Sequence, residues 1–181
     1  MTATATVSPI ASSPSAAPLT VDGLAALDSA ALGQVYEQGR VPASFASLDG
    51  QPRGRMLAPV GRLGRGRAGG VVRRLAGARF FPWAGKSFSS AGSAEGAGIN
   101  RVRLGVTREW FPFATSVQPS VIDGKPTIVL DYDKPENPRV IRRIHDELRE
   151  VAPGLFLGPA MWKAKDGKKL LLWFAIDKTQ A

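Results

Sequence analysis

The chain lacks cysteine altogether and has a single histidine, His145. Without thiols it can form no disulfide, use no thiolate nucleophile and hold no cysteine-based zinc or iron–sulfur site. A single imidazole also argues against histidine-based metal sites, so we expect neither a metal nor another cofactor. Because disulfides are typical of oxidising compartments, their absence favours a cytoplasmic location.

A long apolar run and a recognisable signal peptide are also missing. No stretch of about 18 consecutive apolar residues occurs, so we expect no membrane-spanning helix. Residues 1–20 are small, polar and proline-containing, without a basic segment followed by an apolar one. Because such a segment buries too little apolar surface to fold, we predict a disordered tail over 1–20 and a single domain over 21–181.

Acidic residues are missing between Asp49 and Glu95, a stretch that holds nine of the 24 basic residues. The other 15 basic residues equal the 15 acidic ones, so this stretch carries the whole net charge of +9. Its arginine-rich part, Arg53–Arg79, predicts an anionic partner such as nucleic acid or acidic lipid. No aromatic residue lies among these arginines, although nucleic-acid sites commonly interleave the two. A plain basic surface loop is therefore the alternative.

Helical spacing of apolar residues occurs at two places. In residues 21–39, Asp28 can cap a helix and Gly39 can end one, so we expect one helix or two short ones. Residues 137–151 begin with an Asn-Pro pair, which favours a helix start, and their apolar side chains share one narrow face. We therefore predict a second helix over 137–151.

Alternation of apolar and polar residues predicts antiparallel strands in the second half of the chain. The pairs Asp123-Gly124 and Asp166-Gly167 predict tight hairpin turns between them. The last strand is apolar on both faces, so both faces must be covered, and the helix at 137–151 is the expected cover of one. The predicted strands are 99–106, 109–118, 125–133, 155–163 and 168–177.

Five or more strands joined by turns predict a sheet that curls or closes. The expected fold class is α+β, mainly β: a small antiparallel barrel of calycin or lipocalin-like type with an N-terminal helix and one inserted helix at 137–151. A cone-shaped sheet wrapped around a long helix is the alternative, and it would require a longer helix than 21–39 provides.

Five short segments carry a resemblance to known proteins: GRVPASF, PWAGKSF, INRV, PTIVLDYDKPENP and LFLGPAMWK, at 39–45, 82–88, 99–102, 126–138 and 155–163. They resemble an uncharacterised bacterial group of lipocalin-like proteins built around a GxWxG-type module. The nearest match to that motif is PWAGK at 82–86, which lacks the first glycine. The resemblance implies a calycin-like barrel and a hydrophobic ligand.

Large aromatic residues near the predicted strands are candidates for lining a pocket, because a small barrel is either filled by side chains or holds one ligand. Lys86 is a candidate contact for a carboxylate or phosphate at the barrel mouth. Core packing is the alternative for the aromatic residues, and solvation at the surface is the alternative for Lys86. The predicted ligand-binding residues are Trp83, Lys86, Phe88, Phe113, Tyr132 and Trp162.

Acid–base catalysis is a second candidate chemistry. Asp131 and Asp133 lie at the end of a predicted strand, and His145 lies at the edge of the predicted helical stripe. A carboxylate and an imidazole can exchange protons near neutral pH. The structural alternative is that the carboxylates close a turn and the histidine is half-buried.

Three functions therefore remain open from the sequence. The first is the binding of a small hydrophobic or amphipathic ligand, such as a lipid or fatty acid. The second is an isomerase or hydrolase that uses Asp131 and His145 in the barrel cavity. The third is an anion- or nucleic-acid-binding module that uses Arg53–Arg79. The sequence indicates no particular oligomeric state.

Overall fold

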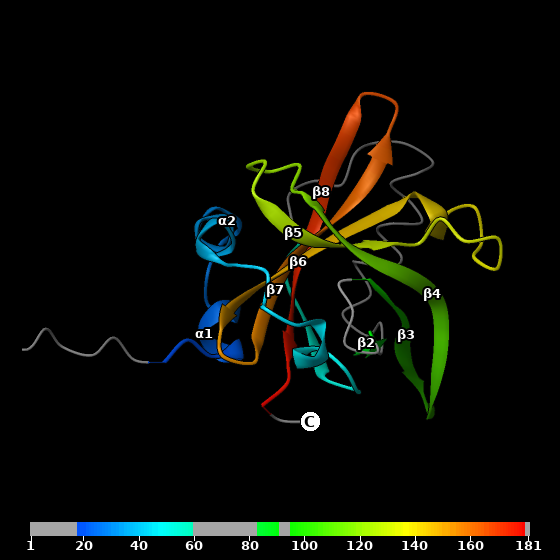
Figure 1. Ribbon diagram of the computed structural model, residues 1–181, viewed down its shortest axis with the longest axis horizontal. Helices are drawn as coiled ribbons and strands as arrows, with labels where there is room; N and C mark the ends of the chain where they lie inside the picture. Colours follow the sequence, from blue (N-terminus) through cyan, green and yellow to red (C-terminus); the bar gives the residue numbers. More distant parts are fainter. Residues whose placement is uncertain (1–17, 60–82, 91–94, 180–181) are drawn as a thin grey trace, which may run out of the picture.

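The computed structural model describes residues 18–59, 83–90 and 95–179, and in these ranges the chain forms a closed antiparallel barrel (Figure 1). Each strand pairs with its neighbour in sequence, and the last pairs back to the first. The mainly β, antiparallel barrel predicted from the sequence is thereby confirmed. The strands are β1 (Arg53–Pro59), β2 (Trp83–Ser89), β3 (Gly96–Leu104), β4 (Val106–Pro119), β5 (Pro126–Asp131), β6 (Ile144–Ala152), β7 (Leu155–Ala164) and β8 (Gly167–Asp177).

Glycines with positive φ form the hairpin turns. Gly124, at φ 72°, lies between β4 and β5, and Gly167, at φ 115°, is the first residue of β8, directly after the turn from β7. Both turns were predicted from their Asp-Gly pairs, because glycine adopts this conformation without steric cost. Gly154, at φ 73°, turns the chain between β6 and β7, where the sequence had suggested the end of a helix.

The predicted helix over 137–151 is wrong. Residues 144–152 form β6, which pairs with β5 and β7, and only a short 3₁₀ turn, η2 (Ile141–Arg143), precedes it. A helix of this length is marginal without tertiary support. Pairing on both edges satisfies the same backbone groups and completes the barrel, so tertiary structure overrides the local spacing. Asn137, the expected helix cap, donates from Nδ2 to two carbonyl oxygens of neighbouring segments.

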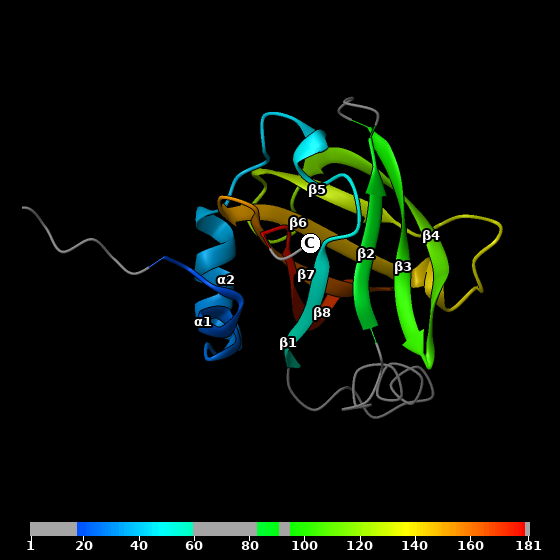
Figure 2. The same cartoon turned by 90° about the horizontal axis from the view of Figure 1, so that it is seen from below.

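Two short helices, α1 (Val21–Ala25) and α2 (Ser29–Gln38), lie against the outside of the barrel wall (Figure 2). The Asp28 side chain accepts a hydrogen bond from the backbone N–H of Ala31, as expected for the N-cap of α2. The cover of the last strand therefore comes from the N-terminal helices and not from 137–151. This outer cluster contains Leu24, Leu32, Tyr36, Leu57, Leu155, Leu157, Trp173 and Ala175.

Apolar side chains fill one half of the barrel interior. Phe45 and Leu48, from the short turn η1 (Phe45–Ser47) and the residue that follows it, pack into this cluster, and the backbone of Gly50 pairs with that of Phe88. The buried interior cluster also contains Phe88, Phe113, Ile128, Leu130, Leu148, Phe156 and Ile176.

Two predictions fall largely outside the described ranges. The predicted tail over 1–20 overlaps them only at 18–20, where Thr20 Oγ1 caps α1 by accepting a hydrogen bond from Gly23 N–H. Most of the arginine-rich segment, residues 60–79, also lies outside them. Within the ranges that are described, no helix is long and apolar enough to cross a membrane.

Candidate functional site

A cavity of about 150 Å³ lies inside the barrel, partly open to the surface. The cavity is lined by Trp83 at the start of β2, Val102 near the end of β3 and Ile144 at the start of β6. It therefore occupies the half of the barrel in which these strand ends meet. Its apolar lining includes Met56, Val102, Phe111, Ile144, Leu172 and Phe174. Four residues, Lys86, Asn100, Tyr132 and Asp146, add polar groups to the lining and are called the polar cluster below.

Lys86 is the centre of the polar cluster. Its Nζ donates to Asn100 Oδ1 at 2.9 Å, to Tyr132 Oη at 2.5 Å and to Asp146 Oδ2 at 3.0 Å. An ammonium group has three protons, so every one of them has a protein acceptor. The side chains of Lys86 and Asp146 are 3% and 5% exposed, so this is a buried ion pair.

Aromatic rings surround the same ammonium group. Four ring centroids lie 5.2–5.4 Å from Lys86 Nζ, a distance at which the face of a ring attracts a cation. Burial lowers the pKa of Lys86, and the charge of Asp146 opposes that shift. The rings and the carboxylate together favour the charged form. The four rings belong to Trp83, Phe113, Tyr132 and Phe174.

Tyr132 and Asn100 complete the cluster. The Tyr132 hydroxyl donates to Asp146 Oδ2 at 3.0 Å and accepts from Asn100 Nδ2 at 3.1 Å. Trp83 Nε1 donates to Asn100 Oδ1 at 3.2 Å, which fixes the orientation of that amide. Burial and the charge of Asp146 raise the pKa of Tyr132 well above its ordinary value, so its hydroxyl stays protonated and acts as a donor.

One carboxylate oxygen of Asp146 accepts no hydrogen bond in the described part of the chain. Asp146 Oδ1 is buried and has no hydrogen-bond partner in the described part of the chain, whereas Oδ2 accepts from two groups. A buried acceptor without a donor costs free energy, and such atoms are uncommon in folded proteins. The polar cluster therefore contains one unused acceptor.

Phe111, in the cavity wall, has a strained backbone. Its φ is 62°, in the left-handed region, which is rare for a bulky side chain. The pairing of β3 with β4 shifts register here, next to Asn100, and Asn100 Nδ2 donates to the Phe111 carbonyl oxygen at 3.3 Å. Strain of this kind costs about 1–3 kcal/mol and is concentrated at binding and catalytic sites.

Three of the six predicted ligand-binding residues line the cavity: Trp83, Lys86 and Tyr132. Lys86 was expected at the barrel mouth or in solvent, but it is buried in the interior, held by its ion pair with Asp146. Tyr132 follows β5 and lies on the same face as the interior residues Ile128 and Leu130, as side-chain alternation along a strand requires.

The other three lie elsewhere. The Phe113 ring contacts the Lys86 ammonium group but belongs to the packed core, and Phe88 packs against it at a centroid distance of 5.5 Å. Trp162 does not line the cavity, and its ring lies 4.8 Å from the guanidinium carbon of Arg143. Core packing, the alternative reading of the aromatic residues, therefore describes Phe88 and Phe113.

Two polar-cluster residues were missed. Asn100 shares its strand face with Val102 under the period-2 rule, so an inward polar residue could have been recognised in INRV. Asp146 gave no such signal, because 137–151 had been assigned to a helix. Read as a strand, Ile144, Asp146 and Leu148 alternate with outward residues and all face the interior.

The catalytic candidates lie outside the cavity. Asp131 and His145 are direct partners across β5 and β6, so the structure does bring them together, but neither is among the residues that line the cavity. Asp131 accepts a hydrogen bond from Lys163 Nζ at 2.9 Å, and His145 Nε2 lies 3.1 Å from Glu147 Oε1. Asp133 forms an ion pair with a nearby arginine and does not line the cavity either.

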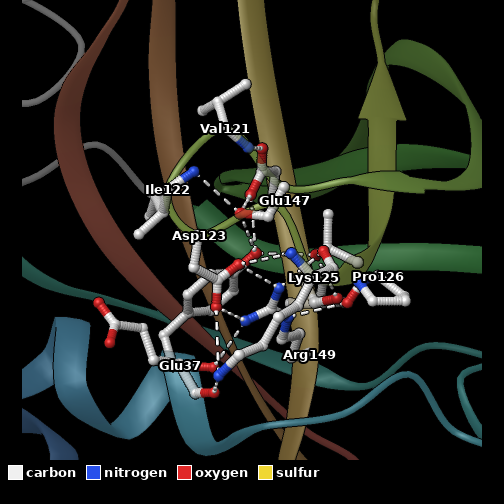
Figure 3. Close-up of polar contacts among 12 residues, drawn as sticks. Glu37, Val121, Ile122, Asp123, Lys125, Pro126, Glu147 and Arg149 are labelled. Carbon is white, nitrogen blue, oxygen red and sulfur yellow. Dashed lines mark hydrogen bonds and ion pairs between the residues drawn. The ribbon is translucent and has the colours of Figure 1, made fainter.

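Glu147 is the centre of a second polar network, on the outer face of β6 (Figure 3). Its carboxylate accepts from Tyr36 Oη at 2.7 Å, from Ser120 Oγ at 2.5 Å and from Val121 N–H at 2.9 Å, and it contacts His145. Burial opposes its charge, but these donors outweigh burial and hold the pKa of Glu147 below its ordinary value. His145 is thus a structural partner of this carboxylate.

Arg149 extends this network to the β4–β5 turn (Figure 3). Its fully buried guanidinium donates to both oxygens of Asp123 at 2.8 Å and stacks on the Tyr36 ring at 4.4 Å. The hydrogen bonds from Arg149 lower the pKa of Asp123 to about 2. The outer network therefore fastens helix α2 and the turn to the barrel wall.

Only Arg53 and Arg55 of the arginine-rich segment are described, and Arg55 pairs with Asp22 of α1.

Among the residues that the structure places, no group of three or more acidic or histidine side chains is arranged to hold a metal ion. No family model matches the chain, and comparisons with curated proteins and with solved structures found no similar protein.

Proposed function

We propose that this protein is a calycin-type barrel that binds a small apolar or amphipathic molecule in its interior cavity. The observation that carries the proposal is a cavity with an apolar wall and a compact polar cluster inside a closed barrel. Binding sites for small molecules commonly combine an apolar lining with a few convergent polar groups. The strained backbone of Phe111 in the wall supports the same conclusion.

The volume of the cavity limits the ligand. At about 150 Å³ it is smaller than the roughly 300–1,000 Å³ of sites for drug-sized molecules. An apolar cavity of about this volume holds a molecule the size of benzene. The ligand is therefore about the size of a substituted benzene, and a long-chain lipid would place only one end inside.

Burial of such a molecule sets the expected affinity. At about 0.8 kcal/mol for each buried carbon group, seven carbons contribute about 5–6 kcal/mol. This corresponds to a Kd of about 0.1 mM for an apolar probe such as toluene, before any polar contact is added.

Filling the cavity tests the proposal. Ala160 lines it, so Ala160→Leu should occupy part of the space and weaken toluene binding by at least about tenfold. Binding is measured by ligand-observed NMR or calorimetry on the full chain. Ala114→Leu is the matched control, because Ala114 is exposed on β4 and should leave binding unchanged. Equal affinity in Ala160→Leu and the wild type, or no binding of any apolar probe to the wild type, would refute the proposal.

A further inference from the structure

The polar cluster determines which polar group a ligand can carry, and this inference rests on the proposed function. We propose that the ligand is an uncharged molecule with an apolar body and one hydrogen-bond donor, as in phenols and small alcohols, and that it binds through the carboxylate of Asp146. Fatty acids and other anions, which the sequence had suggested, are then disfavoured in this cavity.

The first step concerns charge. Lys86 and Asp146 form a buried ion pair at 3.0 Å, so the cationic group in the cavity wall is already balanced. A ligand carboxylate would add an unbalanced negative charge close to Asp146. Burying an unpaired charge is costly, and two like charges raise that cost further.

The second step concerns donors. A bound anion needs free N–H or O–H groups, but the three Nζ protons of Lys86 already have acceptors. The Tyr132 hydroxyl proton is donated to Asp146. An anion would therefore have to break existing hydrogen bonds in order to gain its own.

The third step concerns the unused acceptor. In the described part of the chain, three buried side-chain atoms have no hydrogen-bond partner. Two of them belong to Arg101 and Asn137, which do not line the cavity, and the third is Asp146 Oδ1. Asp146 lines the cavity but its Oδ1 is covered, so a ligand hydroxyl supplies the missing donor once the carboxylate turns about its Cβ–Cγ bond, a torsion that is broad for aspartate. Hydrogen bonds to a charged group are stronger than those between neutral groups.

Three probes built on one methyl-substituted benzene ring separate these possibilities: toluene, p-cresol and p-toluate, which carry a hydrogen, a hydroxyl and a carboxylate opposite the methyl group. Calorimetry or NMR titration of the full chain at pH 7 should show p-cresol binding about tenfold more tightly than toluene. p-Toluate should bind at least about tenfold more weakly than toluene. If p-cresol binds no better than toluene, or p-toluate binds best, this inference fails while the proposed function stands. If none of the three binds, the proposed function itself fails.

A paired variant assigns the preference to the cluster. Lys86→Met combined with Asp146→Leu removes the buried ion pair and leaves only the uncharged Asn100 and Tyr132 as polar groups in the lining. Toluene should bind at least as well as to the wild type, and the advantage of p-cresol should disappear. Asp131→Asn is the control, because it also replaces a carboxylate with an uncharged group. Asp131 lies on β5, next to β6, but outside the cavity. Persistence of the p-cresol preference in the double variant would overturn the role of Asp146. If that variant does not fold, the relative affinities of the three probes for the wild type still decide whether the inference stands.

Discussion

Replacing Asp123 with asparagine should remove a measurable part of the protein's stability, and the size of the loss follows from one pKa. Asp123 accepts two hydrogen bonds of 2.8 Å from the buried guanidinium of Arg149, and its side chain is 13% exposed. The hydrogen bonds from Arg149 lower its pKa from 3.8 to about 2. That difference corresponds to about 2 kcal/mol in the free energy of unfolding.

The same shift sets the pH window. Because the folded pKa of Asp123 lies below the unfolded value, the unfolded chain takes up the proton first as the pH falls. The stabilisation is therefore complete above about pH 4 and is lost as the pH falls towards about 2. Asp123→Asn should lower the free energy of unfolding by about 2 kcal/mol at pH 7 and by much less at pH 2.

Urea denaturation monitored by tryptophan fluorescence, repeated at several pH values between 7 and 2, measures this difference. Asp133→Asn is the control, because Asp133 forms a half-exposed ion pair, and such pairs contribute about 0–1 kcal/mol. The reasoning is refuted if Asp123→Asn is as stable as the wild type at pH 7, or if its deficit is the same at pH 2 and pH 7.

Two further predictions concern the barrel interior and its packing, and both are read from urea midpoints. Lys86→Met should lower the free energy of unfolding by about 3–5 kcal/mol, because it leaves the Asp146 carboxylate buried without its partner. Adding Asp146→Leu should recover most of that loss. A double variant no more stable than Lys86→Met alone would contradict this prediction. Gly158→Ala should lower the free energy of unfolding by about 1–3 kcal/mol or more, because a Cβ there collides with the Glu147 carbonyl oxygen. Gly33→Ala in helix α2, whose new Cβ would lie 3.8 Å from its nearest neighbour, should instead stabilise by about 0.5–1 kcal/mol. Equal effects of the two glycine substitutions would count against this account of the packing.

Local patterns were sufficient for much of the barrel. The apolar run in 168–177 and the Asp166-Gly167 turn identify β8 and its hairpin, because an apolar run and a glycine turn are properties of a few neighbouring residues. The N-cap of α2 at Asp28 is equally local. Such signals need no knowledge of distant parts of the chain.

The same reasoning failed at β6 because its residues satisfy two patterns. Ile144, Leu148 and Val151 have helical spacing, while Ile144, Asp146 and Leu148 form the interior face of a strand. An inward aspartate breaks the apolar alternation by which a strand is recognised. The helical interpretation was therefore the better local fit, and only pairing with β5 and β7 excludes it.

By itself, the sequence determined two hairpin turns, five of the eight strands and the N-terminal helices, since each depends on short-range geometry. Only the tertiary structure decided that three charged positions of β6 are buried, because each requires partners from far along the chain. Asp146 finds Lys86 from β2, Glu147 finds Tyr36 from α2, and Arg149 finds Asp123 from the β4–β5 turn. Burying a charge is tolerable only when such partners are in place, and closure of the barrel brings them together.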